Sequence, residues 1–253
     1  MEYRNIELTV NNDNVAVLKM NRPDRANCLS QEMQDELGSA LDELAERNDA
    51  KCIVLTGTEK VFCAGLDLTE LSKLTKDSND EYTNKIATLF EKAFFHCKPT
   101  IAAVSGGAWG GGFDIAALCD IRIASETAVF CQPELRLAVN PILSPLWMNI
   151  GLARAKELAF TADPIDAREA YRIGLANHVY PVGKYMAETL KLAARIARHD
   201  AGALKKTKDL INQLTANTIS NALEMQFEYI AEGFGGEANS RAAAGILNSL
   251  KNK

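Results

Sequence analysis

The chain has 253 residues, of which 47% are hydrophobic and 24% charged, and its formal net charge is −5 at pH 7. A chain of this length and composition can bury the core of a globular protein. The acidic balance argues against a nucleic acid as the main partner. Every apolar run is shorter than the roughly 18 residues that a membrane helix needs, and no signal-peptide pattern is present. We therefore expect a cytoplasmic protein with no membrane partner.

The N-terminal part predicts strands alternating with a helix. The β-rich runs 6–10 and 15–20, separated by an Asn/Asp turn, are typical of a hairpin. Ser30 can cap a helix that continues with apolar residues at helical spacing to about residue 47. The all-apolar run 52–55 predicts a buried strand. Further along, the polar segment 72–80 is expected to be mobile.

The remaining pattern predicts an α/β domain followed by helices. Helical spacing returns at 82–95, and short strands are expected at 121–124 and 128–131. The chain is then mostly helical, apart from an apolar loop after residue 133 and a last strand near 176–180. Four helical segments are expected over 184–253. We therefore predict a core domain over residues 1–183 and a helical region over 184–253.

One stretch, 101–120, combines a buried strand, a glycine-rich turn and a buried helix. Its glycines are Gly106, Gly107, Gly110, Gly111 and Gly112. The order is neither a P-loop nor a Rossmann turn. The free N–H groups at such a helix start can hold negative charge, and Asp114 follows one turn later. A carboxylate beside an anion-binding backbone is typical of a catalytic site.

A second glycine turn, at 61–67, also follows a buried strand. If the two strands are neighbours, both turns open at one edge of the sheet, and one N–H from each could bind a single carbonyl oxygen. Asp114 and Glu134 would then lie near that oxygen. The residues alone leave alternatives open: close packing for the glycines, a helix-start charge for Asp114 and a surface loop residue for Glu134. The six cysteines lack zinc-site spacing, so buried reduced thiols and no metal site are expected.

Seven segments, taken in this order and spacing, resemble the enoyl-CoA hydratase/isomerase family, also called the crotonase family, over almost the whole chain. They are residues 21–30, 54–57 with 62–68, 98–104, 110–114, 119–125, 132–135 and 170–177. The resemblance implies a spiral of ββα units with a C-terminal helical trimerisation region, assembled as a homotrimer or as a hexamer made of two trimers. It implies an acyl-CoA thioester as substrate, so that coenzyme A is part of the substrate and no separate cofactor is expected.

By the same resemblance, the oxyanion hole is formed by the backbone N–H groups of Leu66 and Gly111. The resemblance further implies contacts to coenzyme A and substrate from Arg25, Ala26, Asn27, Phe62, Ala64, Leu66 and Gly110. Asp114 and Glu134 take the places of the two glutamates that hold the water in the family's hydratases.

The acids at positions 114 and 134 indicate which reaction of the family the chain could catalyse. Hydration of a 2-enoyl-CoA to a 3-hydroxyacyl-CoA would use both, with Glu134 as the principal acid/base and Asp114 orienting the water. A 3-enoyl to 2-enoyl isomerase would need Glu134 alone. The dienoyl isomerases carry a further acid where this chain has Ile142, which excludes that reaction. Trp109, just before the last three glycines, is similar to a feature of the family's decarboxylases, so decarboxylation of an acyl-CoA is an alternative. A non-catalytic acyl-CoA binder is a further one. The loop 136–147 departs from the family pattern, so the acyl group is not indicated.

The last helices are rich in apolar side chains, which predicts an interface between copies of the chain. The positions concerned are Leu223, Met225, Phe227, Ile230, Phe234, Ile246 and Leu250. The alternative is that these side chains cover the protomer's own core.

Overall fold

The computed structural model describes residues 3–233 and 236–251, apart from the side chains of 76–77, 214–223, 225, 229–230, 232–233, 237–238 and 250–251. Its centre is a six-stranded sheet in the order β1-β2-β3-β5-β7-β10. The strands are β1 (Ile6–Val10), β2 (Val15–Met20), β3 (Cys52–Thr56), β5 (Thr100–Val104), β7 (Ile121–Ser125) and β10 (His178–Tyr180). β1 and β2 form the expected antiparallel hairpin, and the later strands add in parallel.

A second, smaller sheet takes up the strands that follow those of the first. In it β4 (Val61–Cys63), β6 (Gly107–Trp109) and β8 (Val129–Cys131) are parallel, and β9 (Ile165–Asp166) is antiparallel to β8. The chain therefore repeats strand, strand, helix, which confirms the predicted α/β spiral of ββα units. β6 was not predicted, because it lies inside the glycine run.

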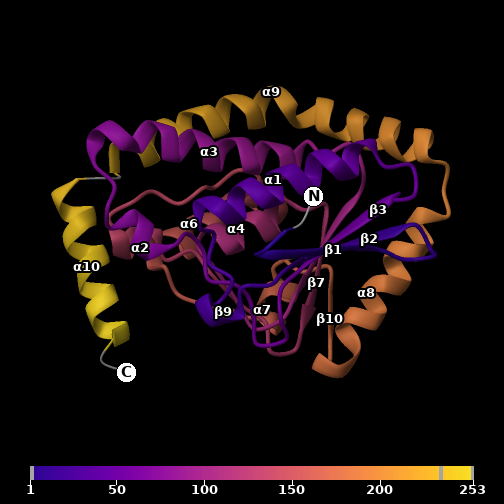
Figure 1. Cartoon of the computed structure of the whole chain (residues 1–253), viewed down its shortest axis with the longest axis horizontal. Helices are drawn as coiled ribbons and strands as arrows, with labels where there is room; N and C mark the ends of the chain where they lie inside the picture. Colours follow the sequence, from indigo (N-terminus) through magenta and orange to yellow (C-terminus); the bar gives the residue numbers. More distant parts are fainter. Residues whose placement is uncertain (1–2, 234–235, 252–253) are drawn as a thin grey trace.

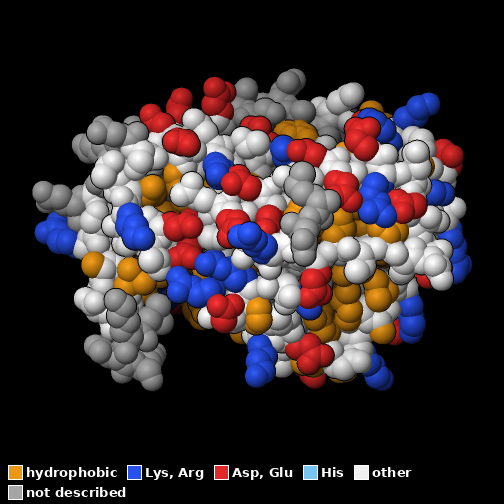
Figure 2. Space-filling view, viewed as in Figure 1, with side chains coloured by type: hydrophobic (Ala, Val, Ile, Leu, Met, Phe, Trp, Pro, Cys, Tyr) orange, Lys and Arg blue, Asp and Glu red, His pale blue; other side chains and the backbone are white. Residues whose placement is uncertain are grey.

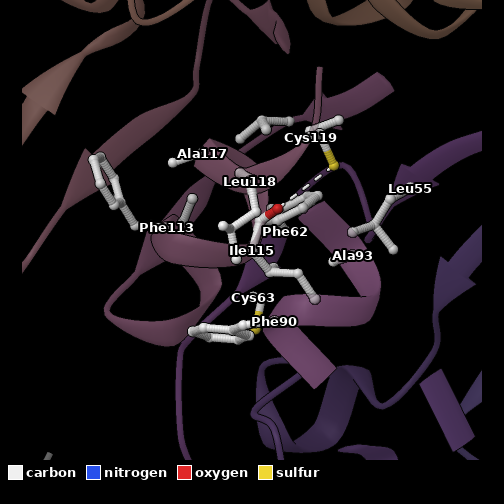
Figure 3. Packing of buried hydrophobic residues seen from close by; sticks show 14 of the residues in the cluster. Leu55, Phe62, Cys63, Phe90, Ala93, Phe113, Ile115, Ala117, Leu118 and Cys119 are labelled. Atoms are coloured by element: carbon white, nitrogen blue, oxygen red, sulfur yellow. Dashed lines mark hydrogen bonds between the residues drawn. The ribbon is translucent and has the colours of Figure 1, made fainter. Parts of the chain in front are cut away.

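Helices cover both faces of the large sheet (Figure 1). Alternate residues of β3 point to opposite faces: Ile53 and Leu55 pack in the cluster with α1 (Gln31–Glu46), α3 (Lys76–Phe94) and α4 (Gly111–Leu118), while Cys52 and Val54 pack against α8 (Val182–Ala197). Figure 3 shows α4 lying within the first cluster, close to Phe62 and Phe90. The shorter helices are η1 (Pro23–Arg25), α2 (Leu68–Leu71), η2 (Glu134–Leu137), α5 (Leu146–Ile150), α6 (Leu152–Thr161) and α7 (Ala167–Arg172).

The expectation of a mobile segment at 72–80 was wrong for its second half. α3 begins at Lys76, six residues before the expected start at residue 82, and is capped by the paired side chains of Thr75 and Ser78. Asn79 is buried in the first turns of α3 and donates a hydrogen bond from Nδ2 to the backbone oxygen of Ala231. Polar residues therefore continue the helix here because one of them anchors it to another helix.

Three helices, not the expected four, are found in the described part of 184–253. After α8, α9 (Ala201–Gly233) runs along α3, and α10 (Glu237–Lys251) lies at the end of the molecule opposite α8 (Figure 1). α10 contacts α2 and η2, and the buried Asn239 donates from Nδ2 to the backbone oxygen of Leu137 over 2.9 Å. None of the described helices is long and apolar enough to cross a membrane.

The predicted interface positions have mixed outcomes. Phe227 was assigned wrongly to an outer surface: it is partly buried on the protomer's own core and packs on Phe90 with ring centroids 6.4 Å apart. Ile246 is half-buried. The other positions lie outside the side chains that the structure describes; they are Leu223, Met225, Ile230, Phe234 and Leu250. On the face shown in Figure 2, acidic and basic side chains are interspersed.

Candidate active site

The two glycine-rich turns are in contact, because β3 and β5 are neighbours and β4 pairs with β6. Gly65 and Gly110 have φ values of +89° and +52°, a region that glycine enters without steric cost. A Cβ on Gly65 would lie 2.6 Å from the carbonyl oxygen of Trp109 and 3.3 Å from the nitrogen of Gly111. Only a residue without a side chain fits there, and this close approach brings the start of α4 against the turn after β4.

Two backbone N–H groups lie at this contact, those of Leu66 and Gly111. Neither has an acceptor among the described residues. Leu29 and Leu66 form an isolated parallel bridge. The N–H of Leu29 donates to Gly65 O, and the N–H of Asp67 donates to Leu29 O. The N–H of Leu66 therefore takes no part in the bridge. Gly111 is the first residue of α4, where an N–H has no partner within the helix. Both groups are thus available to a ligand oxygen.

Asp114 lies in the first turn of α4, enclosed by protein, with 6% of its surface exposed. Its Oδ1 accepts a hydrogen bond of 3.0 Å from Nε2 of Gln132. Burial, followed by repulsion from Glu134, raises the pKa of Asp114 well above its usual value, and the bond from Gln132 offsets only part of this. The carboxyl group is therefore no surface charge at a helix start.

Glu134 begins η2, directly after Pro133 and three residues after the end of β8. The residue as a whole is partly exposed, but its Oε2 is cut off from solvent and has no hydrogen-bond partner among the described residues. A Cβ on Gly110 would lie 3.0 Å from Oε1. Burial raises the pKa of Glu134 to about 7. The interpretation of Glu134 as a surface loop residue is wrong.

Both carboxyl groups line one small cavity of about 40 Å³. Its walls are Leu66, Ile86, Phe90, Gly111, Asp114, Glu134, Val139, Asn140, Ile142 and Phe227. A space of this size holds about three water-sized groups. Because two buried like charges resist ionising together, the pair retains a proton at pH values at which free carboxyl groups are ionised. One member can then act as an acid while the other acts as a base, next to the free N–H groups of Leu66 and Gly111.

Gln132 is a site residue that the sequence analysis missed. It is buried, and its Nε2 also donates to the backbone oxygen of Ile142 over 2.7 Å. It therefore fixes Asp114 against the loop that forms the far wall of the cavity. Its place directly after β8 and two residues before Glu134 was the available signal. Ile142, where a third acid would lie in a dienoyl isomerase, is an apolar wall residue.

The residues expected to hold coenzyme A fall into two groups. Ala64 and Arg25 are exposed, and the Arg25 guanidinium lies 3.5 Å from Asp67 Oδ1. The side chains of Asn27 and Phe62 have no exposed surface. Asn27 accepts from Arg22 N and donates to the carbonyl oxygens of Val61 and Phe62. These two side chains present no surface to a ligand in this structure and shape the loop from inside.

The remaining predicted binding residues are backbone positions. Ala26, partly exposed with φ of +49°, accepts a hydrogen bond from the N–H of Ala64 over 3.0 Å, which joins the 25–27 loop to the turn after β4. Gly110 donates to Cys131 O over 3.0 Å. In the described part of the chain, no group of three or more His, Cys, Asp or Glu side chains could hold a metal ion.

The repeated ββα units define a crotonase-type α/β protein, and the comparisons carry this further. Residues 10–242 match the enoyl-CoA hydratase/isomerase family. A probable enoyl-CoA hydratase of Mycobacterium bovis is 34% identical over 98% of this chain and 96% of its own length. The short-chain-enoyl-CoA hydratase of Clostridium acetobutylicum is 36% identical over 99% and 97%. The crystal structure of an enoyl-CoA hydratase from Bacillus anthracis has a TM-score of 0.81 at 32% identity, covering 90% of this chain and 92% of that one. The chain belongs to the enoyl-CoA hydratase/isomerase family.

Proposed function

We propose that the protein hydrates a 2-enoyl-CoA to a 3-hydroxyacyl-CoA. The observation that carries this proposal is the pair of buried carboxyl groups, both with raised pKa, on one cavity beside two unpartnered N–H groups. The thioester oxygen binds to the N–H groups of Leu66 and Gly111, and the water lies between Asp114 and Glu134. Glu134 takes a proton from the water as the water oxygen adds to C3, negative charge develops on the thioester oxygen, and a proton delivered at C2 completes the product.

Glu134 is the principal acid/base in this proposal. Its Oε2 has no partner among the described residues and so is available to a water or a substrate carbon. Asp114 is held by Gln132 and orients the water. Hydration needs a base that takes a proton from the water and an acid that delivers a proton at C2, and a carboxyl pair that retains one proton can supply both.

Isomerisation of a 3-enoyl-CoA on Glu134 alone is a second candidate. The observation that favours it is the bond from Gln132, together with the shorter side chain at Asp114, since both limit how far that carboxyl group reaches into the cavity. In this reaction Glu134 would remove a proton at C2 and return it at C4, and the same N–H groups would bind the enolate oxygen.

Asp114→Asn separates the two reactions. The asparagine oxygen can still accept from Gln132, so the packing is matched while the carboxylate is lost. We expect hydration of crotonyl-CoA to fall by roughly 100-fold or more, whereas any turnover of a 3-enoyl-CoA should change by less than about tenfold. Both rates are measured from thioester absorbance for the wild type and the variant.

Hydration by the variant at the wild-type rate would contradict the proposal, and wild-type turnover of the 3-enoyl substrate alone would establish the isomerase. If neither substrate reacts while coenzyme A thioesters bind, the protein is a non-catalytic binder and both proposed reactions are wrong.

We also propose that the protein forms a homotrimer or a dimer of trimers. An apolar groove of about 690 Å³ lies between the end of α4 and the first half of α9, apart from the carboxylate cavity. Met148 and Ile211, 39% and 56% exposed, line it. Light scattering at micromolar concentration should give three or six times the chain mass, and the mass of one chain would contradict the interface.

A further inference from the structure

We propose that Phe227 on α9 closes the acyl end of the cavity and restricts the enzyme to short acyl groups. This inference rests on the proposed acyl-CoA function and adds to it the class of acyl group and the residue that selects it. Phe227 was not among the site residues expected from the sequence.

The first step of the argument is the position of Phe227 between two hollows. The inner one is the carboxylate cavity of about 40 Å³. The outer one, of about 510 Å³, lies between α3 and α9. It is lined by Asp80, Thr83, Asn84, Ala87, Glu91, Glu224, Phe227, Glu228 and Ala231. Among the described residues that line the two spaces, Phe227 is the one side chain that belongs to both.

The second step is that Phe227 is held in place. Its ring packs on Phe90 of α3 with the planes inclined at 58°. The neighbouring Gln226 accepts hydrogen bonds through Oε1 from the backbone N–H groups of Leu143 and Ser144, at 3.1 Å for the latter. One end of the loop behind Ile142 is thus tied to α9, one residue away from the ring. On the outer side, Asn79 ties α3 to the backbone of Ala231.

The third step is the size and chemistry of the inner space. Ile86, Phe90, Val139 and Ile142 give it apolar walls, and about three water-sized groups fill it. That room suits the reacting carbons of a four-carbon enoyl group. A longer chain would meet the Phe227 ring, and in a packed wall extra methylene groups force costly displacement. Beyond the ring the hollow has room for several more carbons, at a rim that carries Asp80, Glu91, Glu224 and Glu228.

The test compares substrates of increasing length in matched variants. We expect the wild-type kcat/KM for 2-enoyl-CoA esters to fall by about tenfold or more between four and ten carbons. Phe227→Ala joins the two hollows and should raise the ratio of the ten-carbon to the four-carbon value by about tenfold or more. Phe227→Leu, which keeps an apolar side chain on α9, should shift the ratio in the same direction by less. Lys206→Ala, at an exposed position of α9 that lines neither hollow, should leave the ratio unchanged.

Binding makes the inference independent of the reaction. Calorimetric titration with the saturated esters butyryl-CoA and decanoyl-CoA should show the same preference and the same shift in Phe227→Ala, whether the wild type is a hydratase, an isomerase or a binder. If no substrate turns over but butyryl-CoA binds more tightly than decanoyl-CoA, the proposed function is wrong and the role of Phe227 in selecting short acyl groups is supported. Equal wild-type affinity and turnover for short and long esters, or an unchanged ratio in folded Phe227→Ala and Phe227→Leu, would overturn that role.

Discussion

Replacing Glu134 by glutamine should lower turnover of crotonyl-CoA, and of any 3-enoyl-CoA that reacts, by roughly 100- to 10,000-fold, the usual contribution of a positioned acid/base. Glutamine has nearly the same shape as glutamate, but its amide neither takes up nor releases a proton near neutral pH. Coenzyme A should still bind, because the loop at Arg25 and the donors at Leu66 and Gly111 are unchanged. Steady-state rates with both substrates provide the measurement, and more than about a tenth of the wild-type rate in the variant would contradict the role of Glu134.

The same variant should gain stability relative to the wild type as the pH rises. The folded-state pKa of Glu134 is raised from 4.5 to about 7, so between these values the native protein holds a proton that the unfolded chain has released. Stability from this group is complete at low pH and is lost as the pH rises through 7. A shift of this size corresponds to roughly 3.4 kcal/mol over the whole titration, of which about 2 to 3 kcal/mol falls between pH 5 and pH 8. Urea unfolding should therefore show the stability of Glu134→Gln relative to wild type improving by about that amount between pH 5 and pH 8.

A change in that difference of the opposite sign would mean that Glu134 is ionised in the fold at low pH. Comparing the difference at two pH values cancels any constant cost of the glutamine amide, which would find no partner in the place of Oε2.

Gly111→Pro should lower kcat by roughly 100- to 1,000-fold, because it removes one of the two backbone donors proposed to hold the enolate oxygen. Proline is best tolerated at the first residue of a helix, and Gly111 has that position in α4. The control is Gly111→Ala, which keeps the N–H. Its Cβ would lie 3.4 Å from Leu29 Cδ1 and 3.5 Å from Leu66 Cδ2, which is ordinary contact.

Circular dichroism and the dissociation constant for coenzyme A report whether each variant is folded. A folded proline variant with normal turnover would exclude the Gly111 donor. An equal loss of turnover in the proline and alanine variants would mean that Gly111 is needed for close packing, which is the alternative that the sequence left open.

The sequence predicted what depends on local pattern. Alternation and apolar runs predicted the β1–β2 hairpin and the buried strands β3 and β5. The two glycine turns were expected to meet because each follows one of those strands, and Gly65 shows why: its backbone touches that of Trp109. The contact of the turns and the position of Asp114 and Glu134 near it were expected from that one inference, whereas their enclosure was not.

What the sequence did not predict depends on tertiary contacts. β6 has glycine and alanine where strand propensity is low, and only its partners β4 and β8 make it a strand. The start of α3 looked like a loop because its residues are polar. The hydrogen bond that holds Asn79 there goes to Ala231, which is far away in the sequence. Gln132 is a polar residue whose two acceptors come from elsewhere in the chain. Phe227 was misplaced because an apolar side chain on a helix has the same spacing whether it faces its own protomer or another.

The contact between α10 and η2 has a consequence for the order in which the protein becomes competent. Asn239 donates to the carbonyl of Leu137, at the end of the turn that begins with Glu134. A ribosome releases the sheets, α4 and Glu134 itself well before it releases Asn239. During synthesis, the segment that carries the acid therefore exists for some time without the hydrogen bond from Asn239 to its last residue. The acid is therefore fully braced only after the chain as far as Asn239 has left the ribosome.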